Sequence, residues 1–472
     1  MTRTVGHWIA GSFVESGGEV QEIRSTVSGL PHVAVATGTV ADVDAAAEAA
    51  AAAAAGWRWF TAADRGRLLR DIAGGIRANA EELAGLEIAD TGKVRTTVLG
   101  EIENSAAYFE FYAGLVNLPV GDVLDVAPDQ HVFTRREPFG VVGVITPWNL
   151  PLNQAARAIA PALAAGNTVV CKPAEPTSQT TVALARLASG CGLPEGVFNV
   201  VCGSGPVVGE AIVRHPLVRK VAFTGSVDVG RTIGRIAAER IIPLTLELGG
   251  KSANIVFEDA DLDAAAGEAV RAFVTNAGQV CSSGTRLLVQ RSIHHEFVGK
   301  VAELLHSIRA GEHYGPMITW DQFEKVKNYL NHAASSGRQP VVGGRPADDA
   351  ELAEGAYVEA TLYADVDPDD KLAREEIFGP VLVAIPFDTE EDALRIANDS
   401  EFGLAGAVFS RDISRALRVA ERIEAGQIGV NTWVTGRVET PFGGYKNSGY
   451  GREKGIEALN HYSQLKCVIV RL

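Results

Sequence analysis

Short apolar runs alternate with helical patterns in the middle of the chain, between residues 139 and 247. The runs are rich in β-branched residues and read VVGVIT, NTVVCK, FNVVCG, KVAFTG and IPLTLEL. Strands that alternate with helices indicate βαβ units around a parallel sheet that is covered on both faces. Because such sheets bind ligands at the carboxyl ends of their strands, the residues after each run are the first candidates for a site.

Other segments extend this pattern. The stretch from 252 to about 437 repeats the alternation, with helical patterns at AAAGEAVRAFV and VGKVAELLHSI, and predicts a second α/β domain. The alanine-rich run from Ala45 to Ala55 follows Asp42 and Asp44, acids that favour a helix N-terminus, and predicts a packed helix. LPVGDVLDVAPDQHVFTRRE and the tail QLKCVIVRL are predicted to be extended strands that could pair with a neighbouring subunit.

Composition narrows the class of protein. A chain of 472 residues, 46% apolar and 21% charged, has room for two or three folded domains. The net charge of −15 disfavours nucleic acid and anionic membrane surfaces as partners. Five cysteines, an odd and sparse number, predict a reducing compartment, and the lack of an apolar leader or long apolar run predicts a cytoplasmic protein. The ten histidines, including His294 and His295, show no metal-like spacing and are expected at the surface.

Two segments hold residues that could form and break covalent bonds. NAGQVCSSG, at 276 to 284, holds Cys281 among polar and small residues, a setting that fits an accessible thiol better than a core cysteine. LELGGKS, at 246 to 252, ends a predicted strand with Glu247, and the glycines after it could aim the carboxylate into a cleft. Taken singly, each residue is more often structural than catalytic.

Other strand ends offer groups for a polar ligand. FTGSVDVG places Gly225 and Ser226 before a helix whose amides could bind a phosphate, or the serine could simply cap a turn. CKPAE places Lys172 and Glu175 where they could hold a ribose and disfavour a 2′-phosphate, with a solvated ion pair as the alternative. ITPWNLP offers Asn149 as a donor to an oxyanion, or as a buried structural amide. GSGPVVG departs from the dinucleotide spacing and is a weak signal.

Together these segments resemble the aldehyde dehydrogenase superfamily over almost the whole chain. PWNLP, KPAE, FTGS, LELGGKS, GQVC, EEIFGPV at 375 to 381 and PFGGYKNSGYGREKG at 441 to 455 occur in the order of that family. The separation of Glu247 and Cys281, 281 − 247 = 34 residues, is also the family's spacing of base and nucleophile. Chance agreement of so many segments is implausible.

The resemblance implies an α/β fold with three parts. A Rossmann-like nicotinamide-binding domain is expected at 1–117 and 138–249, and an α/β catalytic domain at 250–440. A small β oligomerisation segment is expected at 118–137 and 455–472, with 441–454 as a linking region. The resemblance also implies NAD as the cofactor, with NADP as the alternative, a small-molecule aldehyde as the substrate, and a homodimer or homotetramer.

Site residues carry over from the resemblance one at a time. Cys281 resembles the nucleophile, Glu247 the general base, and Asn149, with the Cys281 amide, the oxyanion hole. A larger set resembles cofactor contacts, of which the last two match positions that hold the nicotinamide ribose and ring: Trp148, Lys172, Glu175, Gly225, Ser226, Gly230, Leu248, Glu376 and Phe378. Thiolate attack would give an alkoxide that expels hydride, and water would release the acid. Relatives that transfer the acyl group to coenzyme A lack this glutamate, so hydrolysis is expected.

The substrate is indicated only by Arg157, eight residues after Asn149. Family members acting on succinic semialdehyde or on salicylaldehyde also carry arginine here, so a carboxylate or phenolate on the substrate is one hypothesis. The semialdehyde enzymes add a second arginine where this chain has Thr275, and a structural salt bridge for Arg157 is the other hypothesis. A non-catalytic relative and a cysteine hydrolase are the rival functions, and the intact residue set and the nucleotide-binding segments respectively argue against them.

Overall fold

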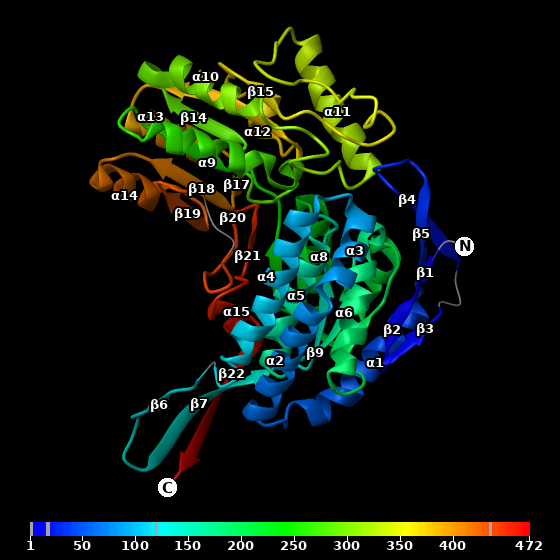
Figure 1. The fold of residues 1–472 in the computed structure, drawn as a ribbon. Helices are drawn as coiled ribbons and strands as arrows, with labels where there is room; N and C mark the ends of the chain where they lie inside the picture. The colour runs from blue at the N-terminus through cyan, green and yellow to red at the C-terminus, as the bar shows by residue number, and fades with distance from the viewer. Residues whose placement is uncertain (1–2, 16–18, 119, 434–436) are drawn as a thin grey trace.

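Two large β-sheets, one mixed and one parallel, are covered by helices and form the body of the protein (Figure 1). The computed structural model describes residues 3–15, 19–118, 120–433 and 437–472. Both sheets contain the strands that the apolar runs predict, and helices separate most of those strands along the chain. The predicted α/β fold class is confirmed.

The first sheet contains all five of the early apolar runs. Its order is β21-β12-β11-β8-β9-β10-β2-β3, and the central strands β12, β11, β8, β9 and β10 are parallel. The bounds are β2 (His7–Ile9), β3 (Ser12–Val14), β8 (Val141–Ile145), β9 (Thr168–Lys172), β10 (Phe198–Val200), β11 (Val218–Thr224), β12 (Leu244–Glu247) and β21 (Gly449–Tyr450). Every residue of β8, β9 and β10 is buried, which explains why these runs are continuously apolar.

The strand order of this sheet creates a binding crevice. Going along the chain, β9 is added on one side of β8, whereas β11 is added on the other. The chain therefore leaves β8 toward one edge of the sheet and leaves β11 toward the other edge. A crevice opens between these diverging connections, at the carboxyl ends of the two strands. The segments ITPWNLP and FTGSVDVG begin at this point.

Helices cover both faces of the first sheet. Their bounds are α1 (Val40–Trp57), α2 (Ala62–Ala78), α3 (Ala80–Thr91), α4 (Arg95–Ala113), α5 (Pro151–Ala164), α6 (Gln179–Gly190), α7 (Glu210–Arg214), α8 (Val227–Arg240) and α15 (Glu457–His461). The predicted alanine-rich helix is confirmed as α1, which buries Ala46 and Ala50 and packs against β9. Its N-cap is Thr39, and Asp42 completes the capping box from inside the helix.

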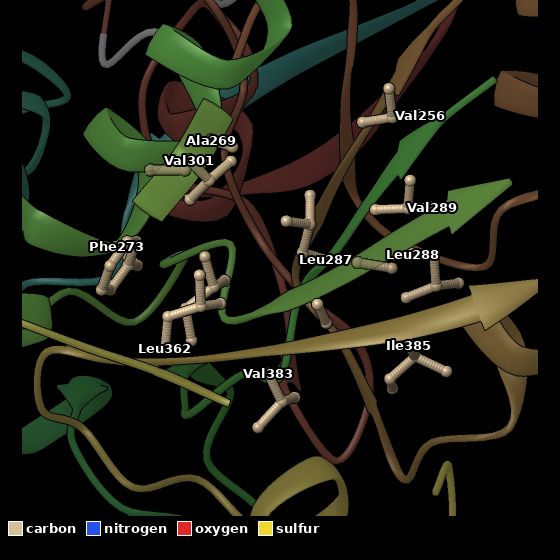
Figure 2. Packing of buried hydrophobic residues seen from close by; sticks show 14 of the residues in the cluster. Val256, Ala269, Phe273, Leu287, Leu288, Val289, Val301, Leu362, Val383 and Ile385 are labelled. Carbon is tan, nitrogen blue, oxygen red and sulfur yellow. The ribbon is translucent and has the colours of Figure 1, made fainter. Parts of the chain in front are cut away.

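The second sheet has a continuous apolar core of its own. Its strands are all parallel in the order β15-β16-β14-β13-β18-β19. The bounds are β13 (Ala253–Val256), β14 (Arg286–Gln290), β15 (Thr361–Tyr363), β16 (Val381–Phe387), β18 (Ala405–Phe409) and β19 (Gln427–Val430). Figure 2 shows members of this core, with Leu287, Val383 and Ile385 from the strands and Phe273 and Val301 from two covering helices. The sheet thus gives a rigid base to the loops that leave it.

Among the described residues, six helices accompany the second sheet, and two small sheets lie outside the two large ones. The helices are α9 (Leu262–Val274), α10 (His294–Leu305), α11 (Trp320–Ser335), α12 (Lys371–Arg374), α13 (Glu390–Asn398) and α14 (Ile413–Arg422). Two small sheets are formed by β1 (Arg3–Val5), β5 (Pro31–Ala36) and β4 (Val20–Arg24), and by β17 (Phe402–Gly403) and β20 (Tyr445–Lys446). The expectation that the histidines lie at the surface is wrong for His294 and for His7, which are buried beside neighbouring acids.

A three-stranded sheet projects from the body as an arm (Figure 1). It consists of β6 (Val123–Leu124), β7 (Gln130–Pro138) and the C-terminal β22 (Ser463–Arg471), with β22 paired to β7 along nine residues. The predicted strands are confirmed here, whereas their pairing with another subunit and the domain boundaries given above remain predictions. In the described part of the chain, no helix combines the length and apolarity needed to cross a bilayer.

Candidate active site

The crevice of the first sheet brings three of the predicted segments together. In the ladder between β8 and β11, Ile145 lies opposite Phe223, and in the ladder between β11 and β12, Thr224 lies opposite Glu247. The residues that follow these strand ends therefore emerge side by side. Trp148, Asn149 and Ser226 come directly after them, so the fold places them at one edge of the sheet with Glu247.

A left-handed turn carries Cys281 toward the same crevice. Asn276, Ala277 and Gly278 have φ angles of 52°, 54° and 73°, conformations that residues other than glycine adopt only at a cost. A side chain on Gly278 would place its Cβ 2.1 Å from the carbonyl oxygen of Gly379, in the segment EEIFGPV. Glycine is therefore required here, and the turn is locked against that segment. Cys281 is half-buried, in agreement with an accessible thiol.

Asn149 is tied to the turn that precedes the thiol. Its side-chain amide donates a hydrogen bond to the carbonyl of Gln279 at 2.9 Å, and the side chain of Asn276 donates to the Asn149 carbonyl at 3.1 Å. An asparagine amide has two N–H donors, so one of them remains for a ligand. Among the residues that the structure describes, the backbone N–H of Cys281 also has no acceptor.

Two cavities meet at Cys281. The larger has a volume of about 640 Å³ and is lined by apolar and aromatic residues such as Leu150, Trp433 and Phe442 together with polar ones. The smaller, of about 160 Å³, is lined by several residues from the predicted set: Trp148, Asn149, Gly225, Ser226, Glu247, Glu376 and Phe378. Cys281 and Gln154 line both cavities. A group bound in either cavity can therefore contact the thiol.

The smaller cavity fits the nicotinamide end of a dinucleotide. The rings of Trp148 and Phe378 meet edge to face at 5.4 Å, and Glu376 accepts a hydrogen bond from the Gly250 N–H at 2.9 Å, which leaves carboxylate acceptor capacity for hydroxyl groups. A side chain on Gly249 would place its Cβ 2.3 Å from Glu376 Oε2, so the glycine makes room for that carboxylate. Ser226 caps α8, whose first amides are free to face an anion.

The other predicted cofactor residues do not line this cavity. Lys172 is the last residue of β9, the neighbour of β8, and its ammonium lies 3.5 Å from the carboxylate of Glu175. Gly230 is needed for packing, because a Cβ there would lie 2.7 Å from Leu248 Cδ2. Leu248 is buried, and its backbone N–H donates to the Ser448 carbonyl at 3.0 Å. Their predicted cofactor roles stay predictions.

Burial and neighbouring charges raise the pKa of both Glu247 and Cys281. Burial, together with the neighbouring Glu453, raises the pKa of Glu247 well above its usual range, and neither carboxylate oxygen has a hydrogen-bond partner among the described residues. Burial also raises the pKa of the Cys281 thiol to about 11, with Glu247 adding to the rise, while Arg157 and Lys454 lower it. These two cations thus stabilise the thiolate and offset part of the effect of burial, which favours the neutral thiol.

Arg157 has a partner that the sequence did not reveal. Its guanidinium forms an ion pair with Glu453, and the side chains are only 4% and 2% exposed. Burial lowers the pKa of Arg157, but Glu453 and Glu247 more than offset this effect and raise it. A second bond goes to Thr224 Oγ1 at 3.3 Å. The structural salt bridge is therefore the hypothesis that the structure supports, although Arg157 still lines the larger cavity.

Sequence reasoning missed Glu453 and Lys454 as site residues. Both lie in the segment PFGGYKNSGYGREKG, whose glycines and charges read as a polar loop. The backbones of Glu453 and Phe442 exchange hydrogen bonds at 2.7 and 2.8 Å, and Lys454 then turns into the left-handed region with a φ of 60°. Both charged side chains are buried at this turn. Only the match of the whole segment to the family's order of motifs could have indicated that it lies at the site.

The chain is similar to aldehyde dehydrogenases in sequence and in structure. The model of the aldehyde dehydrogenase family matches residues 13–468. A betaine aldehyde dehydrogenase from Staphylococcus aureus, solved in complex with NAD+, is 37% identical, with 99% of this chain and 95% of that chain covered and a TM-score of 0.96. A mutant aldehyde dehydrogenase from Bacillus cereus is 37% identical, with 99% and 97% covered and a TM-score of 0.96.

Proposed function

Because this chain belongs to the aldehyde dehydrogenase family, we propose that it oxidises an aldehyde to the carboxylic acid with NAD as hydride acceptor and Cys281 as covalent nucleophile. The observation that carries the proposal is the position of Cys281 where the two cavities meet. An aldehyde in the larger cavity and a nicotinamide in the smaller one would both contact the thiol. A plain cysteine hydrolase would need only one of these cavities.

The first step is attack by the Cys281 thiolate on the aldehyde carbon. A carbon–sulfur bond forms, and the carbonyl oxygen becomes an alkoxide. Arg157 and Lys454 favour the thiolate that this step requires. The free N–H of Asn149 and the backbone N–H of Cys281 would donate hydrogen bonds to the alkoxide. Each such donor typically lowers the barrier by about 2.7–4 kcal/mol.

NAD, when bound, accepts the hydride that leaves the carbon of this alkoxide. Trp148, Phe378 and Glu376 would hold its nicotinamide ribose and ring, and Ser226 with the first turn of α8 would bind its phosphates. Lys172 and Glu175 would bind the adenosine ribose, where a carboxylate accepts two hydroxyl groups and repels a 2′-phosphate. The NAD+ bound to the S. aureus enzyme supports NAD as a cofactor.

Glu247 would act in the second half of the reaction, which releases the acid. The loss of hydride leaves a thioester on Cys281, and Glu247 removes a proton from water as the water attacks the thioester carbon. The raised pKa of Glu247 makes its carboxylate a strong base once it has lost its own proton. The product is the carboxylic acid, and the thiol is regenerated.

We also propose that the arm formed by β6, β7 and β22 joins subunits into a homodimer or homotetramer. The arm exposes a series of large apolar side chains that a monomer would leave in water: Val123, Leu465, Ile469 and Leu472 are 74%, 59%, 66% and 79% exposed. Sedimentation of the wild type as a monomer at micromolar concentration would contradict this proposal.

The test of the proposed reaction is a matched count of its products. The purified protein is incubated with NAD and an aldehyde panel, without coenzyme A, and reduced cofactor and carboxylic acid are both measured. We expect one acid for each reduced NAD in the wild type and neither product with Cys281→Ala. Acid formed from an activated ester, with no cofactor reduced from any aldehyde, would support a hydrolase instead.

A further inference from the structure

The larger cavity holds a buried lysine to which the reaction above gives no contact with the substrate. Lys454 is 5% exposed and lines this cavity together with Cys281. Its ammonium lies 4.7 Å from the centre of the Phe442 ring. Within residues 3–15, 19–118, 120–433 and 437–472, that ammonium forms no hydrogen bond and no ion pair. The ammonium of this buried side chain therefore faces the cavity without an anion and is placed to bind an anionic ligand.

Of the other charged side chains that line the cavity, all but the exposed Arg437 are neutralised in pairs. Arg157 is paired with Glu453, and Arg271 is paired with Glu268 at 2.5 Å. On the acidic side, Glu101 accepts a hydrogen bond from Lys93 at 2.6 Å. The cavity therefore keeps an excess positive charge in a protein whose net charge is −15.

The acids nearest to Lys454 do not cancel its charge. Glu453 is engaged by Arg157, as described above. Burial and Glu453 raise the pKa of Glu247 well above its usual range, and neither of its carboxylate oxygens bonds to Lys454 among the described residues. Burial lowers the pKa of Lys454 to about 8, so its side chain is still mostly charged at neutral pH. The ammonium is thus available to a ligand anion.

From this arrangement we infer that the substrate is an aldehyde carrying a carboxylate, and that Lys454 binds the carboxylate while Cys281 attacks the aldehyde. The inference rests on the proposed function and names its substrate class. Arg157, the residue that the sequence favoured for this task, is already occupied by Glu453. A cationic aldehyde is disfavoured, because Lys454 would repel it.

The kinetic test compares pairs of aldehydes that differ only in the carboxylate. The pairs are succinic semialdehyde with butyraldehyde, and 4-carboxybenzaldehyde with benzaldehyde. For each pair the ratio of kcat/KM, charged over neutral, is measured in the wild type, Lys454→Met and Lys454→Arg. We expect the ratio to fall roughly 10- to 100-fold in Lys454→Met, the usual loss for a bond between charged groups, and to be largely kept in Lys454→Arg.

Arg437 supplies a matched control. It also lines the larger cavity, but its side chain is exposed, so water screens its charge. We expect Arg437→Gln to change the ratio less than about two-fold. An equal fall in Arg437→Gln and Lys454→Met would indicate a diffuse field instead of a contact, and would overturn the inference. The inference would also be overturned if Lys454→Met lowered kcat/KM equally for charged and neutral aldehydes, which is expected if Lys454 only activates the thiol.

A second measurement does not depend on dehydrogenase activity. Iodoacetate and iodoacetamide alkylate the same thiol and differ mainly in charge, and mass spectrometry of the Cys281 peptide separates this thiol from the exposed Cys467. We expect the ratio of the rates, iodoacetate over iodoacetamide, to fall several-fold in Lys454→Met. If this ratio falls while no aldehyde reduces NAD, the proposed function fails and the anion site stands. If aldehydes are oxidised and neither ratio changes, the anion site fails.

Discussion

The ion pair between Arg157 and Glu453 makes a stability prediction that separates its two possible roles. Arg157→Met removes the guanidinium and leaves Glu453, whose side chain is 2% exposed, without a partner and close to Glu247. Breaking a buried ion pair from one side typically costs about 3–5 kcal/mol, because an uncompensated charge stays buried. Both side chains are too buried for solvent screening to reduce this cost. The loss of the 3.3 Å bond to Thr224 adds to it.

The double variant Arg157→Met/Glu453→Met tests the same reasoning from the other side. Replacing both charges by apolar side chains of similar size is often neutral or even stabilising, so the double variant should regain most of the loss. Equilibrium unfolding in urea, followed by tryptophan fluorescence, measures the free energy of unfolding of the wild type, of Arg157→Met, of Glu453→Met and of the double variant. A single variant as stable as the wild type, or a double variant no more stable than the singles, would refute the account of Arg157 as a structural residue.

Three further predictions concern the reaction and its cofactor. Because the pKa of Glu247 is raised by burial and by Glu453, the folded protein keeps this proton as pH rises above the usual carboxyl range. The free energy of unfolding should therefore fall with rising pH through that window, by about 1.4 kcal/mol per pH unit for one full proton, and Glu247→Gln should remove this fall. Urea unfolding of both proteins between pH 5 and 8 checks the sign. Wild-type and Glu247→Gln stabilities that change in parallel with pH would contradict the prediction. Asn149→Ala should lower kcat by roughly 10²- to 10³-fold in steady-state assays, since one alkoxide donor is lost. Glu175→Ala should raise kcat/KM with NADP relative to NAD, and an unchanged ratio would exclude Glu175 from the ribose site.

Local patterns were enough to predict the two sheets and the accessibility of Cys281. The runs that became β8 to β10 are buried on both faces, so their continuous apolarity gave a clear signal. Cys281 stood out because polar and small neighbours are unusual around a core cysteine. Both features depend only on residues that are neighbours in the sequence, so the sequence alone can reveal them.

Long-range pairing is what the sequence could not supply. Glu453 follows Arg157 by 453 − 157 = 296 residues, and no local pattern links the two. Lys454 reads as one more charge in a polar loop, and it is buried only because the backbone pairing of Phe442 with Glu453 is followed by a left-handed turn. The same is true of His294, whose burial depends on the packing of α10. The substrate hypothesis moved from Arg157 to Lys454 for this reason.

The most direct test of the central proposal is pre-steady-state kinetics of Glu247→Gln with NAD and an aldehyde that the wild type oxidises. If Cys281 carries the acyl group and Glu247 activates the water, the variant should produce one reduced NAD per active site in a rapid burst and then nearly stop, with the acyl group detectable on Cys281 by mass spectrometry. Steady turnover at the wild-type rate, with no burst and no acylated Cys281, would contradict the covalent route and the role given to Glu247.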